Sequence, residues 1–215
     1  MKVVRPDWRI AAMTESDPTR LMKHLEAMGR ICYQSEDDIT ETSYDKFLRG
    51  IIKRGHEAVL EHATVTAVVV CDRGITHEIV RHRIAAYCQE STRYCNYSKG
   101  KFGNEITVIK PPFWDQESTK YSTWKHACEV AEAAYFDLLS VGCTPQQARD
   151  VLPTSTKTQI GITMNMREWR HFFRLRCSPA AHPQMIEVAK LGLIDMYNYF
   201  PCLFEDIYKE VFAID

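Results

Sequence analysis

The chain has 215 residues, of which 45% are hydrophobic and 26% are charged, and its formal net charge at pH 7 is −1. This is the composition of an ordinary globular protein, and the near-neutral charge argues against partners held by bulk positive charge, such as nucleic acid or an anionic membrane surface. No apolar stretch approaches the ~20 residues of a membrane-spanning helix, and the N-terminus lacks a signal-peptide core, so a membrane partner is not expected.

The first half of the chain predicts two helices and a strand. Apolar residues recur with a helical period over residues 17–34, with Thr14 or Ser16 as candidate N-caps. A second helix is predicted to begin after Ser43 and to end at Gly55. The β-branched, partly alternating residues 59–71 predict a strand.

Further helices are predicted in the middle of the chain. Residues 75–83 look like a short helix. Farther along the chain, the stretch Lys110–Pro112 breaks regular structure and leads to a long helix over about residues 117–141. Thr144 and Gln147 form a capping-box pattern with a proline in the first turn, and Pro153 closes that short helix.

The last part of the chain predicts a second strand and two more helices. Residues 157–166 alternate, a helix follows through Arg176, and a final helix spans about residues 184–199. Long helices interleaved with few strands predict a mixed α+β fold in a single domain over residues 1–215.

Eight cysteines are scattered along the chain without a CxxC pair. This pattern favours reduced thiols, and hence a cytoplasmic location, over a disulfide framework or a zinc site. His77, Glu78 and His82 are spaced HE-x3-H, which misses the helical i, i+4 geometry of zinc peptidases, so no metal site is predicted.

The most informative stretch is a local cluster of cations. Arg81–Arg83 reads Arg-His-Arg, and after seven residues Ser91–Tyr94 reads Ser-Thr-Arg-Tyr. Arginine suits phosphate because its planar fork donates to two oxygens and stays charged. The alternative interpretation is a helix end with ion pairs to Glu78, three and four residues earlier.

The spacing within the cluster limits its geometry. On a helix Arg81 and Arg83 lie roughly 200° apart. Either they serve two ligands or the helix ends there and the chain turns around one ligand. Gln89, Ser91 and Arg93 alternate, so an extended segment projects all three to one side.

These residues resemble the RHR-x7-S-x-R pattern of flavin-dependent thymidylate synthases. Other segments resemble the same family in the same order: Gly55–Glu57, Glu61–His62, Ala148–Pro153, Asn165–Arg167 and Leu175–Arg176. The resemblance implies a compact fold around a central sheet and a homotetramer whose active sites combine residues from several subunits. It implies a methyltransferase that converts dUMP to dTMP with FAD, NADPH and 5,10-methylenetetrahydrofolate, by flavin hydride transfer without an enzyme nucleophile.

The resemblance also implies roles for individual residues. Arg176 holds the uracil and promotes its ionisation, and His56 aligns with a histidine near the flavin and substrate, although it equally well caps a strand. The implied dUMP-binding set is Glu78, Ile79, Val80, Arg81, Gln89, Glu90, Ser91, Thr92, Arg93, Arg149 and Arg176. The implied FAD-binding set is Glu61, Arg81, His82, Arg83, Gln89, Asn165, Met166, Arg167 and His171.

Some positions depart from the family pattern or leave alternatives open. Ala58 and Cys32 stand where some members carry hydroxyl residues, Ala180 where some carry His, and Glu78 where some carry Gln. Cys202 follows a proline, as in the other, unrelated thymidylate synthase, but its apolar surroundings indicate a buried structural cysteine. The alternative function is a non-catalytic nucleotide- or flavin-binding protein.

Overall fold

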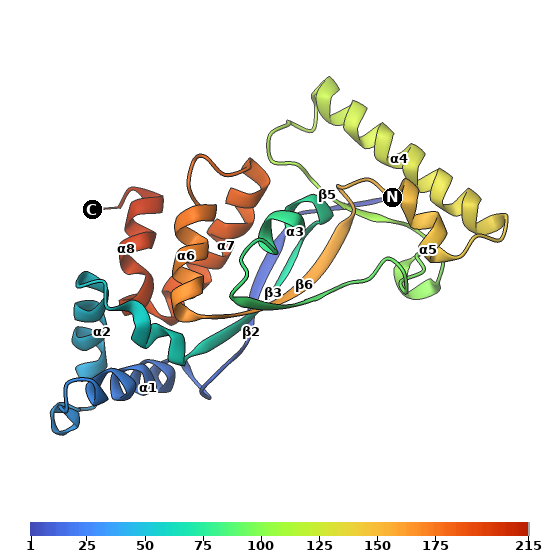
Figure 1. Cartoon of the computed structure of the whole chain (residues 1–215). Helices are drawn as coiled ribbons and strands as arrows, with labels where there is room; N and C mark the ends of the chain where they lie inside the picture. Colours follow the sequence, from blue (N-terminus) through green and yellow to red (C-terminus); the bar gives the residue numbers. More distant parts are fainter. Residues whose placement is uncertain (215) are drawn as a thin grey trace. The chain divides into compact units, whose positions relative to one another are not determined.

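The computed structural model of the chain describes residues 1–214 (Figure 1). In chain order, with η for 3-10 helices, the elements are β1 Lys2–Val4, β2 Asp7–Met13, α1 Pro18–Ile31, η1 Glu36–Asp38, α2 Ser43–Lys53, η2 Glu57–His62, β3 Thr64–Asp72, α3 Arg73–Ile79, β4 Ala85–Gln89, η3 Gly100–Phe102, β5 Thr107–Ile109, α4 Thr119–Ser140, α5 Pro145–Ala148, η4 Arg149–Val151, β6 Lys157–Asn165, α6 Met166–Arg176, α7 Pro183–Tyr199 and α8 Pro201–Phe212. The mixed content confirms the predicted α+β class. Among residues 1–214 no helix is long and apolar enough to span a membrane.

The strands form a larger and a smaller sheet. The larger sheet has the strand order β2-β3-β6-β4. In the smaller sheet β1 and β5 pair in parallel, with Val3 opposite Val108. The strong alternation of β3 and β6, with Val65, Ala67 and Val69 buried on β3, is what makes these two strands recognisable in the sequence.

The chain divides into two compact units. Unit 1 comprises Met1–Asp7, Val69–Arg81 and Cys88–Ile160, and unit 2 comprises Trp8–Val68, His82–Tyr87 and the chain from Gly161 onward. That the whole chain is one domain stays a prediction.

Unit 1 has a core where α4, α5 and η4 pack together. Tyr97, Ile106, Val108, Cys128 and Tyr135 are buried there. The Nε1 of Trp124 on α4 donates to Ser155 at 3.0 Å. The long helix predicted over residues 117–141 is confirmed within two residues at each end.

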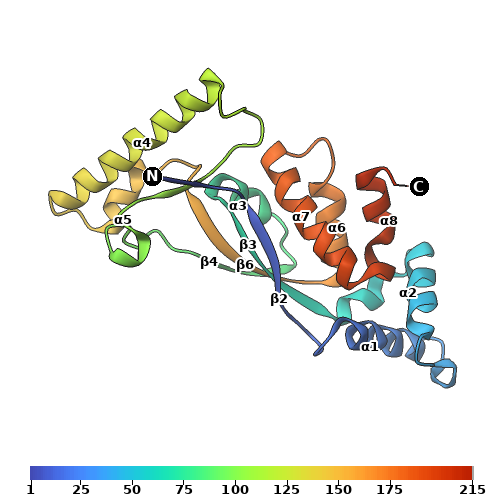
Figure 2. The same cartoon turned by 180° about the vertical axis from the view of Figure 1, so that it is seen from behind.

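Unit 2 contains an aromatic core. The rings of Trp8, Trp169, Phe172 and Phe173 lie 5.3 to 6.3 Å apart, and Phe204 of α8 lies 5.8 Å from Phe173. Helices α6, α7 and α8 pack against one another, and they lie side by side in Figure 1 and again from behind in Figure 2. This core fixes α6, which carries most of the candidate site of unit 2.

Two predicted element starts are wrong. The N-cap of α1 is Asp17, whose carboxylate accepts from the N–H of Arg20 at 2.9 Å, rather than Thr14 or Ser16; Thr14 instead bonds to the chain at Thr64. The strand predicted from residue 59 begins at Thr64. Residues 57–62 form η2 instead, because only Leu60 among them is buried and period-two burial begins after them.

The predictions also missed elements. The helix expected over residues 75–83 is α3, which begins at Arg73 and ends at Ile79, so the Arg-His-Arg motif follows it. The helix over residues 184–199 is confirmed as α7 but is not the last, because Pro201 occupies the first turn of α8. The strands β1, β2, β4 and β5 were not predicted.

Candidate functional site

Helix α6 begins with a side-chain cap that fixes its first turn. The Oδ1 of Asn165 accepts from the N–H of Glu168 at 2.8 Å, which satisfies one of the free donors at the helix start. The helix then presents Glu168, His171 and Arg176 on successive turns. The helix that the sequence predicts after residue 166 and through Arg176 is confirmed.

A chain of hydrogen bonds links three side chains of unit 2, which we call the Glu168–His82–Arg176 chain. Nδ1 of His82 lies 2.8 Å from Oε1 of Glu168, and the Nε–H of Arg176 donates to Nε2 of His82 at 3.1 Å. His82 is 4% exposed and Glu168 is 8% exposed. The middle residue of the Arg-His-Arg motif is therefore buried. Its imidazole bridges Glu168 and Arg176, which both belong to α6.

The surroundings keep His82 neutral. Burial lowers the pKa of His82, the charges of Arg176 and His171 lower it further, and the hydrogen bond that His82 donates to Glu168 opposes this only in part. The Tyr87 hydroxyl donates to the backbone carbonyl of His82 at 2.6 Å, and burial raises the pKa of Tyr87 to about 12, so this donor stays protonated.

His82, Glu168 and His171 each offer a metal-ligand atom within 4.8 Å of the others. Both ring nitrogens of His82 are already engaged, one by Glu168 and the other by Arg176. A cation at Nε2 would displace the Arg176 guanidinium, and one at Nδ1 would displace the hydrogen that Glu168 accepts, so we assign no metal to this cluster.

A cavity of about 410 Å³ opens beside these residues in unit 2. It is lined by Glu57, Glu61, Ile84, Asn165, Arg167, Glu168, His171 and Arg174. Four of these belong to the predicted FAD-binding set. The Nη1 of Arg167 donates to Glu61 at 2.5 Å, and both side chains are about half exposed, so this ion pair stands at the rim in contact with solvent.

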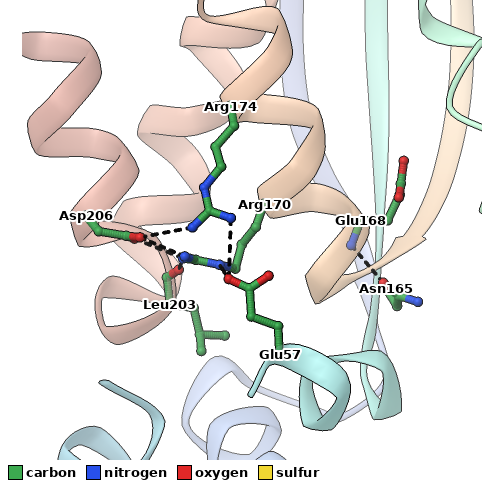
Figure 3. Close-up of polar contacts among 7 residues, drawn as sticks. All are labelled: Glu57, Asn165, Glu168, Arg170, Arg174, Leu203 and Asp206. Atoms are coloured by element: carbon green, nitrogen blue, oxygen red, sulfur yellow. Dashed lines mark hydrogen bonds and ion pairs between the residues drawn. The ribbon is translucent and has the colours of Figure 1, made fainter. Parts of the chain in front are cut away.

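The wall of the cavity is held by a buried guanidinium (Figure 3). Arg170 is fully buried; it donates to Asp206 at 2.9 and 2.7 Å, to Glu57 at 3.2 Å and to the carbonyl of Leu203. Arg174 reaches the same two carboxylates at 3.4 Å. Since the partners lie on η2 and α8, this network joins both elements to α6.

Unit 1 holds most of the predicted dUMP-binding set. The segment after β4 is a turn in which Ser91 Oγ accepts from the N–H of Arg93 at 3.3 Å and the Ser91 carbonyl accepts from Cys95 at 2.9 Å. Gln89, Ser91 and Arg93 would project to one side only in an extended segment, and this condition is not met because the strand ends at Gln89. Arg93 is exposed, with its guanidinium 5.5 Å from the ring centre of Tyr94.

Two neighbouring side chains have structural partners instead. Glu90 accepts from Lys157 at 2.8 Å and from the Tyr97 hydroxyl at 3.1 Å, and all three line a separate cavity of about 430 Å³ in unit 1. Gln89 donates to Thr76 at 3.1 Å and to Thr158 at 3.3 Å. A contact of either side chain with a ligand requires it to exchange these bonds.

Three more residues of the predicted sets are buried. Ile79 and Met166 are completely buried, and Thr92 is only 4% exposed. Each belongs to the predicted dUMP- or FAD-binding set, and its contact with a ligand stays a prediction.

The remaining predicted residues lie at the surface or partly so. Arg81, Arg83, Val80 and His171 are exposed, and Glu78 and Arg149 are half-buried. His56 is exposed at the start of η2, with its Nδ1 3.1 Å from the Tyr33 hydroxyl. The Arg-His-Arg motif crosses the boundary of the two units after Arg81.

Glu168 and Tyr87 were missed from the sequence. Glu168 stands three residues after Asn165, which reads as a capping-box pattern and so draws attention to the helix start. Nothing in the local pattern indicates that its carboxylate reaches a histidine 86 positions earlier.

Comparisons with known proteins agree with one another. The family described as "Thymidylate synthase complementing protein" matches residues 15–202. A flavin-dependent thymidylate synthase of Pyrococcus furiosus is 38% identical over 169 residues, which cover 78% of this chain and 68% of the relative. One from Mycobacterium sp. (strain JLS) is 33% identical, with 85% and 78% covered. The UMP/dUMP methylase PolB of Streptomyces cacaoi, solved with 5-Br UMP, is similar in fold, with a TM-score of 0.76 at 20% identity over 98% of this chain and 97% of PolB.

Proposed function

Because the chain belongs to the flavin-dependent thymidylate synthase family, we propose that it converts dUMP to dTMP with 5,10-methylenetetrahydrofolate, NADPH and FAD. The balanced reaction takes dUMP, methylenetetrahydrofolate, NADPH and one proton to dTMP, tetrahydrofolate and NADP⁺. The methylene carbon leaves N5 and N10 of the folate, forms a bond to C5 of the uracil and gains a hydride. The proton that C5 loses and the proton that is taken up go to the two folate nitrogens.

The residues of unit 2 are chemically suited to FAD. The cavity of about 410 Å³ lies within the usual range for small-molecule sites and is large enough for one part of the dinucleotide. Its guanidinium, imidazole and amide groups, from Arg167, His171 and Asn165, are donors for an anionic, hydrogen-bonding ligand. The Arg167–Glu61 ion pair is about half exposed, and such a pair is worth only ~0–1 kcal/mol, so a phosphate can displace the carboxylate at low cost.

For dUMP, the proposed phosphate contacts come from the turn after β4. Arg93 is exposed and always charged, and Ser91 lies in the same turn. A guanidinium fork and a hydroxyl bind a phosphate monoester by charge-assisted hydrogen bonds. The further candidates for dUMP contacts are Arg149, which is half-buried, and Arg81, which is exposed.

The single observation that carries the proposal is the way Arg176 is held. Its Nε–H is bound by a neutral, buried imidazole, so the plane of the guanidinium is oriented before any substrate arrives. A preorganised cation beside the uracil stabilises negative charge that develops on the ring when C5 becomes nucleophilic. The chemistry that FAD supplies when bound is to carry the hydride of NADPH to the new methyl group.

The proposal needs no enzyme nucleophile. Burial raises the pKa of Cys177 and of Cys202 to about 12, so neither thiol is ionised at working pH, and the thiolate is the nucleophilic form. The Ser91 hydroxyl already accepts from the Arg93 N–H, in keeping with a binding role.

We also propose a homotetramer with shared active sites, in the cytoplasm. Large apolar side chains next to the motif in the sequence are exposed, with Ile84 at 66% and Tyr94 at 81%, and neighbouring subunits of a tetramer would cover such side chains. All eight cysteines are free, which suits a reducing compartment.

The test uses the purified protein loaded with FAD. It is expected to be yellow, to oxidise NADPH faster when dUMP is present, and to form dTMP. Arg176→Ala should lower dTMP formation ~10²–10³-fold, the usual effect of removing a preorganised donor, and should keep its flavin absorption. Arg20→Ala, at an exposed guanidinium of α1, is the matched control and should be unchanged.

Two outcomes would overturn the proposal. An Arg176→Ala variant that forms dTMP at the wild-type rate would show that Arg176 does not have the proposed role. A wild-type protein that binds dUMP but never consumes NADPH would instead be a non-catalytic binding protein.

A further inference from the structure

The carboxylate of Glu168 has a partner that its place in the helix does not require. At the third helical position after the Asn165 cap, a glutamate ordinarily bonds back to the cap residue or simply favours the positive helix end. Here its Oε1 lies 2.8 Å from Nδ1 of His82. The residue is buried, so the carboxylate is held within the protein rather than in solvent.

The two bonds of His82 define its tautomer. A carboxylate accepts only, so Nδ1 must carry the hydrogen that Glu168 binds. The Nε–H of Arg176 donates only, so Nε2 of His82 must be unprotonated. The neutral Nδ1–H imidazole is the one form that satisfies both neighbours at once.

We propose that Glu168 is a positioning residue for Arg176, acting through His82: it holds the imidazole in the Nδ1–H tautomer, so that Nε2 remains the acceptor that orients the guanidinium. This inference rests on the proposed function for the role of Arg176 in the reaction. The bonds themselves do not depend on it.

Loss of the carboxylate has a specific consequence. Without an acceptor at Nδ1, a buried N–H is left unpaired, and the imidazole can remove this penalty by moving its hydrogen to Nε2. The Nε2–H form then faces the Nε–H of Arg176, two donors with no acceptor, and the guanidinium must rotate away. The geometry of Arg176 therefore depends on Glu168 without a direct bond between them.

The groups around His82 also make the effect visible in pH dependence. Glu168, His171 and Arg176 of α6 and Tyr87 of β4 face the ring and its backbone. Of these, only Glu168 acts to raise the pKa of His82. Below that pKa, His82 gains a proton at Nε2 and can no longer accept from Arg176, so activity falls. Removing the charge of Glu168 should move this acid limb to lower pH.

The experiment compares Glu168→Leu, which removes the acceptor but keeps the volume, with Glu168→Gln, which keeps an acceptor oxygen but removes the charge. Glu210→Gln, at an exposed glutamate of α8, is the control for a lost charge in unit 2. The proteins are labelled with ¹⁵N-histidine, and His82 is assigned by loss of its signal in His82→Gln. Protonation of each ring nitrogen is then read by NMR alongside kcat and KM for dUMP.

We expect His82 to be protonated at Nδ1 in wild type and in Glu210→Gln, and to shift toward Nε2–H in Glu168→Leu. The kcat of Glu168→Leu should fall ~10–100-fold, as for a small misplacement of a catalytic group, with KM for dUMP changed far less because the phosphate contacts remain. Glu168→Gln should retain more kcat than Glu168→Leu, with its acid limb at lower pH than wild type.

A Glu168→Leu protein that is folded and retains the Nδ1–H tautomer, or that keeps wild-type kcat, would overturn the inference. An unchanged acid limb in Glu168→Gln would overturn it too, because a purely structural glutamate at the helix start would not move it. If wild type forms no dTMP, the proposed function fails, and the tautomer measurement alone still decides whether Glu168 controls His82.

Discussion

The Cys202 thiol lies in the core of unit 2. The residue is 3% exposed, its Sγ lies 3.2 Å from the sulfur of Met22, and burial raises its pKa to about 12. A thiol in this state packs as a small apolar group and does not act as a nucleophile.

Cys202→Ala should therefore keep dTMP formation close to wild type and lose ~1 kcal/mol of stability, as expected for a modest core truncation. The measurement is the rate of dTMP formation together with the melting temperature. A variant that is folded, contains flavin and makes no dTMP would require a thiol mechanism.

At the residue scale the sequence indicates which segments carry the candidate site, but it does not indicate which of their side chains are buried. The motif residues Arg81 and Arg83 are exposed as a ligand site requires, but His82 between them is buried. Ile79 and Met166 neighbour motif residues in the sequence, and both are buried, so their predicted ligand contacts stay predictions. The direction of a side chain depends on packing from distant segments, which a local pattern does not contain.

At the scale of elements, Arg170 joins η2, α6 and α8. Burial raises the pKa of Asp206, but the hydrogen bonds and charge of Arg170 outweigh it and hold this pKa below its ordinary value. A carboxyl group with a depressed folded pKa stabilises the protein fully above its unfolded pKa, and this contribution is lost as the pH falls through the folded value.

Asp206→Asn should therefore lower the free energy of unfolding at neutral pH. The deficit relative to wild type should stay constant down to the ordinary aspartate pKa of about 3.9 and shrink below it. Urea unfolding of wild type and Asp206→Asn, from neutral pH to below the ordinary aspartate pKa, measures this deficit in the free energy of unfolding. A deficit that is the same at acid pH and at pH 7 would show that Asp206 does not contribute through its charge.

Helix α7 packs against β2 through a glycine. A Cβ on Gly192 would lie 2.6 Å from a ring carbon of Trp8, and this indole is buried among the aromatic rings of unit 2. The ring has no room to move, so the helix depends on the missing side chain for its close approach.

Gly192→Ala should lower the stability by ~1–3 kcal/mol, the usual cost of overpacking. Gly50→Ala on α2 is the matched control, because its Cβ would meet only the end of the exposed Arg54 side chain. It should gain ~0.5–1 kcal/mol from helix propensity. Thermal unfolding measures the stability of both variants. A Gly192→Ala protein as stable as Gly50→Ala would contradict the close packing of Gly192 against Trp8.

Among the elements, the long helices were predictable and the short strands were not. The helices α1, α2 and α7 carry apolar residues with a helical period, and α4 follows the break at Lys110–Pro112. The strand β1 has three residues and pairs with β5, more than 100 positions away, so nothing local marks it. Helix α8 was missed because Pro201 looks like a stop, although proline is equally suited to the first helical turn.

At the scale of the whole molecule, most of the predicted dUMP-binding residues fall in unit 1 and most of the FAD-binding residues in unit 2. The proposed tetramer with shared active sites can be tested by complementation between chains. Arg93→Ala and Arg176→Ala are each expected to be nearly inactive alone.

When the two variants are co-expressed, the mixed population should regain about a quarter of wild-type activity if each site takes these arginines from different chains, because about one site in four then receives both intact arginines. Separate affinity tags on the two chains allow mixed assemblies to be isolated and assayed. Mixed tetramers that stay inactive would place both arginines of a site on one chain.

Transfer of an isotope-labelled methylene carbon tests the central claim most directly. The purified protein is supplied with FAD, NADPH, dUMP and methylenetetrahydrofolate labelled at the methylene group. We predict that the label appears in the C5 methyl group of dTMP, with one NADPH oxidised for each dTMP formed. NADPH oxidation with the label retained in the folate would contradict this account and would identify a flavin reductase instead.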